Sequence, residues 1–159
     1  MRKEYPADPG VRFPPPLLYV VGLGVGILLH RWLPLHLLPS QARIVGVLVG
    51  WLLVGFWAGL SGWAMVTFVR KRTSILPNRP ATLLVTWGPY RFSRNPMYVA
   101  LSALHVGVSF LVDTIWPVLL LPAVWVSLYV LVVRREESYL AATFGSEYES
   151  YCGRVRRWL

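Results

Sequence analysis

The chain has 159 residues, of which 55% are hydrophobic and 14% charged, a composition that excludes an ordinary soluble globular protein and predicts a membrane protein. Sixteen Lys and Arg against seven Asp and Glu give a net charge of +9. These basic residues lie between apolar segments, so the charge predicts contact with membrane lipids and no nucleic-acid partner. The single cysteine, Cys152, excludes a disulfide within the chain.

Four apolar segments follow one another along the chain and predict four transmembrane helices. A helix that spans roughly 30 Å of hydrocarbon needs about 20 apolar residues. The second segment carries no charged residue from Ile44 to Val69 and is the clearest span, whereas the third, from Met97 to Val112, is short. The predicted helices cover about residues 15–31, 43–69, 96–112 and 114–134.

The third and fourth helices follow each other almost directly and predict a C-terminal helical hairpin, with its turn at Asp113 and Thr114. Pro117 lies in the first turn of the fourth helix, where a proline is well tolerated because its missing N–H has no helical partner. The sequence therefore predicts an all-α, polytopic membrane protein that forms a single domain over residues 1–159.

The basic residues also predict the orientation in the membrane. All but two of the sixteen Lys and Arg lie before the first helix, in the loop at 70–95, or at and beyond the end of the fourth helix. By the positive-inside rule both termini, this loop and the amphipathic tail at 135–159 are cytoplasmic. We expect the loop and the tail to carry the functional site, in a membrane such as the bacterial inner membrane.

Glycines recur at helical spacing in the first two apolar segments. Small residues three or four positions apart let helices approach each other closely. Packing within the chain is the main interpretation, and the same small-residue faces leave room for an oligomer. The glycines lie at positions 22, 24, 26, 46, 50, 55 and 59.

The polar segments on the predicted cytoplasmic side carry aromatic and acidic residues. The loop ends in "TLLVTWGPYRFSRNPMY", in which Gly88 and Pro89 predict a turn and Pro96 the start of the third helix. The tail reads "EESYLAATFGSEYESY" and predicts an amphipathic helix, broken at Gly145, that folds back over residues 82–98. Two interpretations of Glu136 and its acidic neighbour stay open: solvated salt bridges, or a carboxylate that binds hydroxyl or ammonium groups of a ligand.

The order of these motifs resembles the integral-membrane methyltransferase superfamily that includes isoprenylcysteine carboxyl methyltransferase and phosphatidylethanolamine N-methyltransferase. "LLVTWGPYRFSRNPMY", a helical hairpin, "EE" and "FGSEYESY" follow one another over about residues 82–155. The form "NPMY" is more similar to the phospholipid branch and to small bacterial members than to the isoprenylcysteine branch.

The resemblance implies S-adenosylmethionine as the methyl donor, bound at the cytoplasmic ends of the last helices. Val132 stands where the isoprenylcysteine enzymes have an arginine for the substrate carboxylate, so a lipid amine, or another lipophilic or small acceptor, is favoured over a prenylcysteine carboxylate. No metal site is implied. The implied donor-binding residues are Thr82, Leu83, Leu84, Val85, Tyr90, Asn95, Pro96, Met97, Tyr98 and Glu136.

Two residues are candidates for a general base. Alignment of donor and acceptor can supply most of the catalysis of methyl transfer, but an amine acceptor must lose its proton before it attacks. His105 lies well inside the third helix, where an ionisable residue is a functional candidate, although a neutral histidine bonded to a neighbouring helix is the structural alternative. Glu137 is the second candidate base.

Two other functions compete with the methyltransferase. The C-terminal region is also similar to that of sterol-type membrane reductases, which use NADPH and are longer. A small non-enzymatic membrane protein, in which the motif only stabilises the hairpin, is the third hypothesis. Binding of adenosylmethionine, of NADPH, or of neither distinguishes the three.

Overall fold

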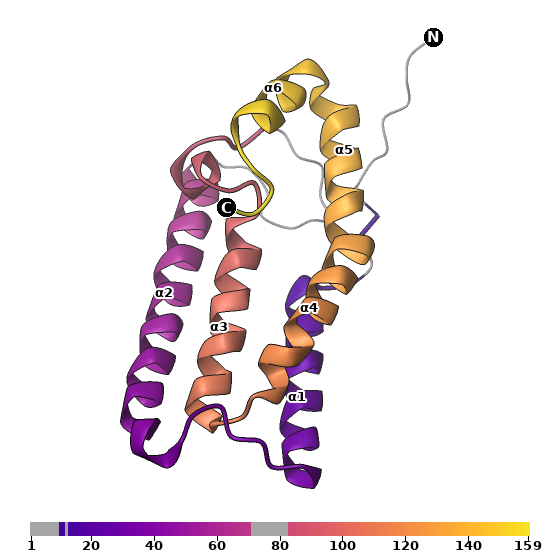
Figure 1. The fold of residues 1–159 in the computed structure, drawn as a ribbon. Coiled ribbons are helices and arrows are strands. Elements are labelled where there is room, and N and C mark those ends of the chain that lie inside the picture. Colours follow the sequence, from indigo (N-terminus) through magenta and orange to yellow (C-terminus); the bar gives the residue numbers. More distant parts are fainter. Residues whose placement is uncertain (1–9, 12, 71–82) are drawn as a thin grey trace.

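Helices make up most of the part of the chain that the computed structural model describes, which is residues 10, 11, 13–70 and 83–159 (Figure 1). No β-strand occurs in these residues, so the prediction of an all-α protein is confirmed there. The α-helices are α1 (Pro15–Trp32), α2 (Arg43–Arg70), α3 (Pro96–Val112), α4 (Trp116–Leu128), α5 (Arg134–Phe144) and α6 (Ser146–Arg154).

Three helical segments among the described residues are long and apolar enough to cross a membrane. They are Pro15–Trp32, Ser40–Arg70 and Trp116–Phe144. Large apolar side chains cover their outer faces, as Trp51 and Leu52 on α2 do with 62% and 73% of their surface exposed, which suits contact with lipid. The protein is therefore an integral membrane protein. The 17 residues of α3 rise only about 26 Å, so the fourth span stays a prediction.

The last helix is longer than the predicted range 114–134. A π-helical segment, Tyr129–Val133, joins α4 directly to α5, so one helix runs from Trp116 to Phe144. Charged residues begin at Arg134 and end the apolar segment, but no glycine or proline follows there to end the helix. Gly145, which has a φ of 52°, ends it instead.

Small residues allow the helices to pack closely. On α2, a Cβ added to Gly50 would lie 3.0 Å from the Gly107 carbonyl oxygen of α3. On α1, Gly22 and Gly26 lie against α4 in the same way. An added Cβ at Gly59 of α2 would meet nothing within 4 Å, so the spacing there does not serve packing among the described residues.

The connections gather at two ends of the bundle (Figure 1). At one end the turn between α3 and α4 meets the segment after α1, where the Asp113 carboxylate accepts hydrogen bonds from His36 Nδ1 at 2.9 Å and from the Leu37 N–H at 3.3 Å. Partial burial alone would raise the pKa of Asp113, but these bonds outweigh it and lower the pKa. At the other end lie the start of α3, the helices α5 and α6, and the C-terminus.

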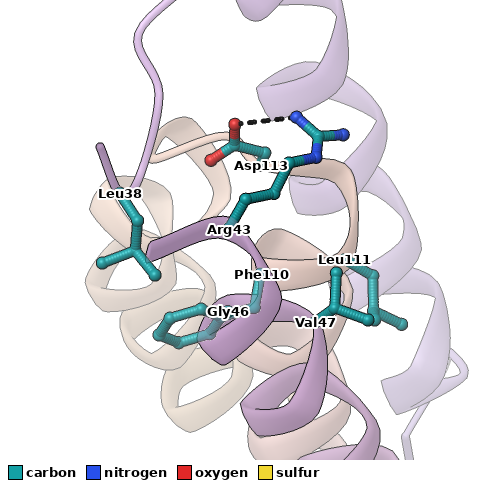
Figure 2. A pocket seen from close by; sticks show the side chains of 7 residues that line it. All are labelled: Leu38, Arg43, Gly46, Val47, Phe110, Leu111 and Asp113. Atoms are coloured by element: carbon teal, nitrogen blue, oxygen red, sulfur yellow. Dashed lines mark hydrogen bonds and ion pairs between the residues drawn. The ribbon is translucent and has the colours of Figure 1, made fainter. Parts of the chain in front are cut away.

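A small pocket opens at the Asp113 end, between α2 and α3 (Figure 2). The Arg43 guanidinium lies 3.4 Å from the Asp113 carboxylate at its rim. The space suits about one water molecule, which is too little for a cofactor. The pocket is lined by Leu38, Arg43, Gly46, Val47, Phe110, Leu111 and Asp113.

Candidate functional site

A tyrosine and a glutamate meet at the end of the bundle opposite this pocket. The Tyr98 hydroxyl donates to the Glu136 carboxylate, 2.9 Å from Oε1 and 3.1 Å from Oε2. Pro96 starts α3 and so places Tyr98 in its first turn, while the π-helical segment precedes the turn of α5 that carries Glu136. A carboxylate oxygen can accept two hydrogen bonds, so Glu136 keeps acceptor capacity for a ligand's hydroxyl or ammonium groups.

Apolar and aromatic side chains of the loop before α3 form two clusters at this end of the bundle. Val85 and Tyr90 form a buried cluster with Ala64 of α2, and Met97 packs against that cluster. Leu84 packs instead against the tail. The sequence-predicted donor residues that the structure describes at this end are Leu83, Leu84, Val85, Tyr90, Asn95, Pro96, Met97, Tyr98 and Glu136. Thr82 lies outside the described residues.

The tail lies over the loop through its tyrosines. Tyr148 and Tyr151 of α6 form a buried cluster with Leu84, and the Tyr151 hydroxyl donates to the Tyr90 carbonyl at 2.6 Å. Burial raises the pKa of both phenols, so both stay protonated at neutral pH and can donate. The tail therefore covers the loop at Leu84 and Tyr90.

Glu137, predicted as a candidate base, is engaged by two arginines. Arg157 approaches it with two nitrogens, Nε at 2.8 Å and Nη2 at 2.9 Å, and Arg94 Nη1 lies 3.2 Å away. The hydrogen bonds to Glu137 raise the pKa of the Arg157 guanidinium further above neutrality. Both oxygens of Glu137 thus hold the tail to the start of α3.

His105, the other candidate base, lies deeper in the bundle. Its side chain is fully buried and its Nε2 lies 3.0 Å from the Pro117 carbonyl of α4. It follows Tyr98 by two turns of α3, or about 10 Å, so the structure does not bring it to Glu136. The edge of its ring faces Tyr19, with 5.9 Å between the ring centroids.

A polar network that sequence reasoning missed fills the space between His105 and Glu136. The Tyr19 hydroxyl of α1 lies 3.1 Å from the Tyr98 carbonyl and 3.0 Å from Ser102 Oγ, and the Trp125 indole N–H donates to the same Ser102 at 2.8 Å. These residues join three helices beneath the site. Polar side chains at positions 98, 102 and 105, on one face of a helix, were the signal in the sequence.

A comparison with known families matches more than half of the chain. The family model described as phospholipid methyltransferase matches residues 45–147, a range that includes both Tyr98 and Glu136. The chain therefore belongs to the phospholipid methyltransferase family, a class of membrane methyltransferases, and the resemblance found in the sequence is confirmed.

One relative is similar over part of its length. The nickel-cobalt-cadmium resistance protein NccN of Alcaligenes xylosoxydans xylosoxydans is 31% identical over 98 residues, which is 61% of this chain and 46% of that protein. The chain thus spans about half the length of the curated relative that it matches. No solved structure matches the chain.

His105→Ala is expected to destabilise the protein by about 3 kcal/mol, because it leaves a cavity in the core and removes the bond that joins α3 to α4. Thermal unfolding in detergent measures this effect. His105→Gln, which keeps an N–H donor, should recover part of the loss. Affinity for adenosylmethionine should stay unchanged below the unfolding temperature, and its loss without a loss of stability would place His105 in the functional site.

Proposed function

We propose that the protein transfers a methyl group from S-adenosylmethionine to a lipophilic or small acceptor, with a lipid amine favoured. The contact between Tyr98 and Glu136 carries this proposal, because it holds a carboxylate beside apolar side chains inside the family-matched range. Such a carboxylate can accept hydrogen bonds from ribose hydroxyls or from an ammonium group. Val85 and Met97 supply apolar surface suited to an adenine ring.

Adenosylmethionine supplies a methyl carbon bound to a positively charged sulfur when it binds. The residues of the chain have to bind the donor, orient it toward the acceptor and exclude water. Alignment of donor and acceptor alone can lower the barrier by several kcal/mol. Glu136 orients the donor through its free acceptor sites, and Tyr98 fixes the direction of the Glu136 carboxylate. The tail, with Tyr148 and Tyr151 buried against the loop, limits access of water from one side.

The favoured acceptor follows from the charges near the site. Val132 is fully buried with Tyr19 and Val124 and presents no cation that could bind an acidic acceptor. An amine acceptor needs no such cation. His105 and Glu137 are both engaged by other groups. We therefore propose that the amine loses its proton to water before the methyl group is transferred.

The site faces the cytoplasm in this proposal. Exposed arginines surround that end of the bundle, at the end of α2, on the loop before α3, at the start of α5, and at and after the end of α6. An excess of Arg and Lys is typical of cytoplasmic segments, where it also meets anionic lipid headgroups. The exposed arginines are Arg70, Arg91, Arg134, Arg135, Arg154 and Arg156.

Calorimetry on the purified protein in detergent tests the proposal. S-adenosylmethionine and S-adenosylhomocysteine are each expected to bind with a Kd on the order of 1 μM, or about −8 kcal/mol. NADPH, titrated in the same way, should not bind. Binding of NADPH alone would assign the protein to the sterol-type reductases, and binding of none of the three would leave the motif with a structural role.

A further inference from the structure

The residues after α6 return to the start of α3. Val155 has an extended backbone, and the chain then runs alongside the segment that leads into α3 (Figure 1). The Arg94 N–H donates to the Arg156 carbonyl at 2.9 Å, and Asn95 Nδ2 donates to the Arg157 carbonyl at 3.0 Å. The family-matched range ends at 147, so Arg156 and Arg157 lie outside it while Arg94 and Asn95 lie inside.

The side chain of Arg157 fixes this segment in place. Its two nitrogens meet Glu137 as a fork, which is the strongest geometry for a guanidinium and a carboxylate. Arg94, whose side chain is 14% exposed, shares the same carboxylate, whose side chain is 19% exposed. The Arg157 guanidinium also lies over the Tyr129 ring, 5.1 Å from its centroid. Glu137 and Tyr129 thus define the position of the Arg157 guanidinium.

The backbone of the segment orients Asn95. A carbonyl can only accept a hydrogen bond, so the Asn95 group that faces the Arg157 carbonyl is the amide NH₂. The amide oxygen of Asn95 is thereby turned the other way. Asn95 precedes the first turn of α3, and its side chain does not cap the helix because it is held by the tail. The side chain is therefore pre-oriented, one turn before Tyr98.

Trp158 packs at the same end of the bundle as Tyr98. Its ring stacks on Trp125 of α4, with centroids 5.8 Å apart and planes 6° apart. Trp158 and Tyr98 both pack against the buried cluster that contains Val132. Removal of the segment would uncover Trp125 and the part of this cluster on which Trp158 packs.

We propose that Arg157 is a positioning residue of the donor site. Bound to Glu137, it holds the segment after α6 in place, so that the Arg157 carbonyl orients Asn95 and Trp158 packs on the same apolar cluster as Tyr98. This inference rests on the proposed function, since it takes the Tyr98 and Glu136 site as the donor site. Glu137 then serves the reaction through Arg157 and the tail rather than through a proton.

Donor affinity tests the role of Arg157. Arg157→Gln and Glu137→Gln are each expected to weaken adenosylmethionine binding about tenfold, and the double variant should bind no more weakly than either single variant, because both changes break one contact. Arg157→Lys keeps the charge without the fork, so its Kd for adenosylmethionine should lie between those of the unsubstituted protein and Arg157→Gln. Arg156→Gln is the matched control, since it removes the same charge from an exposed side chain while its carbonyl remains. Its Kd should stay within twofold of the unsubstituted protein.

Hydrogen exchange tests the same inference without a ligand. The Arg94 amide, which donates to the Arg156 carbonyl, should exchange at least about tenfold faster in Arg157→Gln and Glu137→Gln than in Arg156→Gln. If the unsubstituted protein does not bind adenosylmethionine, the proposed function fails, while faster exchange still supports the Arg157 contact. Unchanged exchange, an unchanged Kd in Arg157→Gln, or an equal loss of affinity in Arg156→Gln would overturn the inference. Should Arg157→Gln fail to fold, Arg157→Lys decides by the same two measurements.

Discussion

Glu136→Ala is expected to weaken S-adenosylmethionine binding about 100-fold while the helices stay folded. Loss of a hydrogen bond to a charged group costs about 1.5–3 kcal/mol, and 2.7 kcal/mol corresponds to about 100-fold in Kd. The carboxylate contacts Tyr98 at one end of the bundle and is not a member of the buried apolar cluster beneath it. Calorimetry gives the Kd, and thermal unfolding of the same sample reports the fold.

Two further variants make the Glu136 result specific. Glu136→Gln keeps an oxygen for the Tyr98 hydroxyl but loses the charge, so its Kd should rise by about tenfold. Glu149→Ala removes the same type of side chain from an exposed position on α6 and should leave binding unchanged. An unchanged Kd in a folded Glu136→Ala protein would remove Glu136 from the donor site.

Gly26→Ala is expected to lower the free energy of unfolding by about 2–3 kcal/mol. The added Cβ would lie 2.7 Å from Pro117 Cγ and 2.8 Å from the Pro117 backbone nitrogen. A proline ring and a helix backbone cannot turn aside as a flexible side chain can, so α1 must move away from α4. This movement also loosens Tyr19, which bonds to α3 beneath the site.

Gly24→Ala provides the control on the same helix. An added Cβ there meets nothing within 4 Å, and alanine has a higher helix propensity than glycine by about 1 kcal/mol. Its unfolding temperature in detergent should equal or exceed that of the unsubstituted protein, whereas that of Gly26→Ala should fall by several degrees. Equal unfolding temperatures for the two variants would contradict the close contact between α1 and α4.

Part of the fold could be predicted from the sequence because its signals are local. Pro96 starts α3, and Asp113, one of the residue types that tolerate a left-handed backbone, ends it with a φ of 57°. The continuation of α4 into α5 could not be predicted, because hydropathy reports where a helix leaves lipid rather than where it ends. The π-helical segment at Tyr129–Val133 likewise has no signature in residue type.

The sequence marked Glu136 and Glu137 as candidates but could not predict their separate contacts. Composition left Glu136 and Glu137 equivalent, and the resemblance to the family singled out Glu136. Neighbours on a helix point about 100° apart, so one of them reaches Tyr98 and the other reaches Arg157. The role of Arg157 depends on a contact between segments that are distant in the chain, which no local pattern reports.

The continuous helix from Trp116 to Phe144 also fixes the depth of the site. The Trp116 indole N–H donates to the Leu33 carbonyl at 2.8 Å, which ties the lower end of the helix to the segment after α1. From there to Glu136 the helix rises about 30 Å, which equals the thickness of the hydrocarbon core. A thinner bilayer must tilt this helix or leave part of it in water. Methyl transfer to an acceptor within the bilayer should therefore depend on the acyl-chain length of the surrounding lipid.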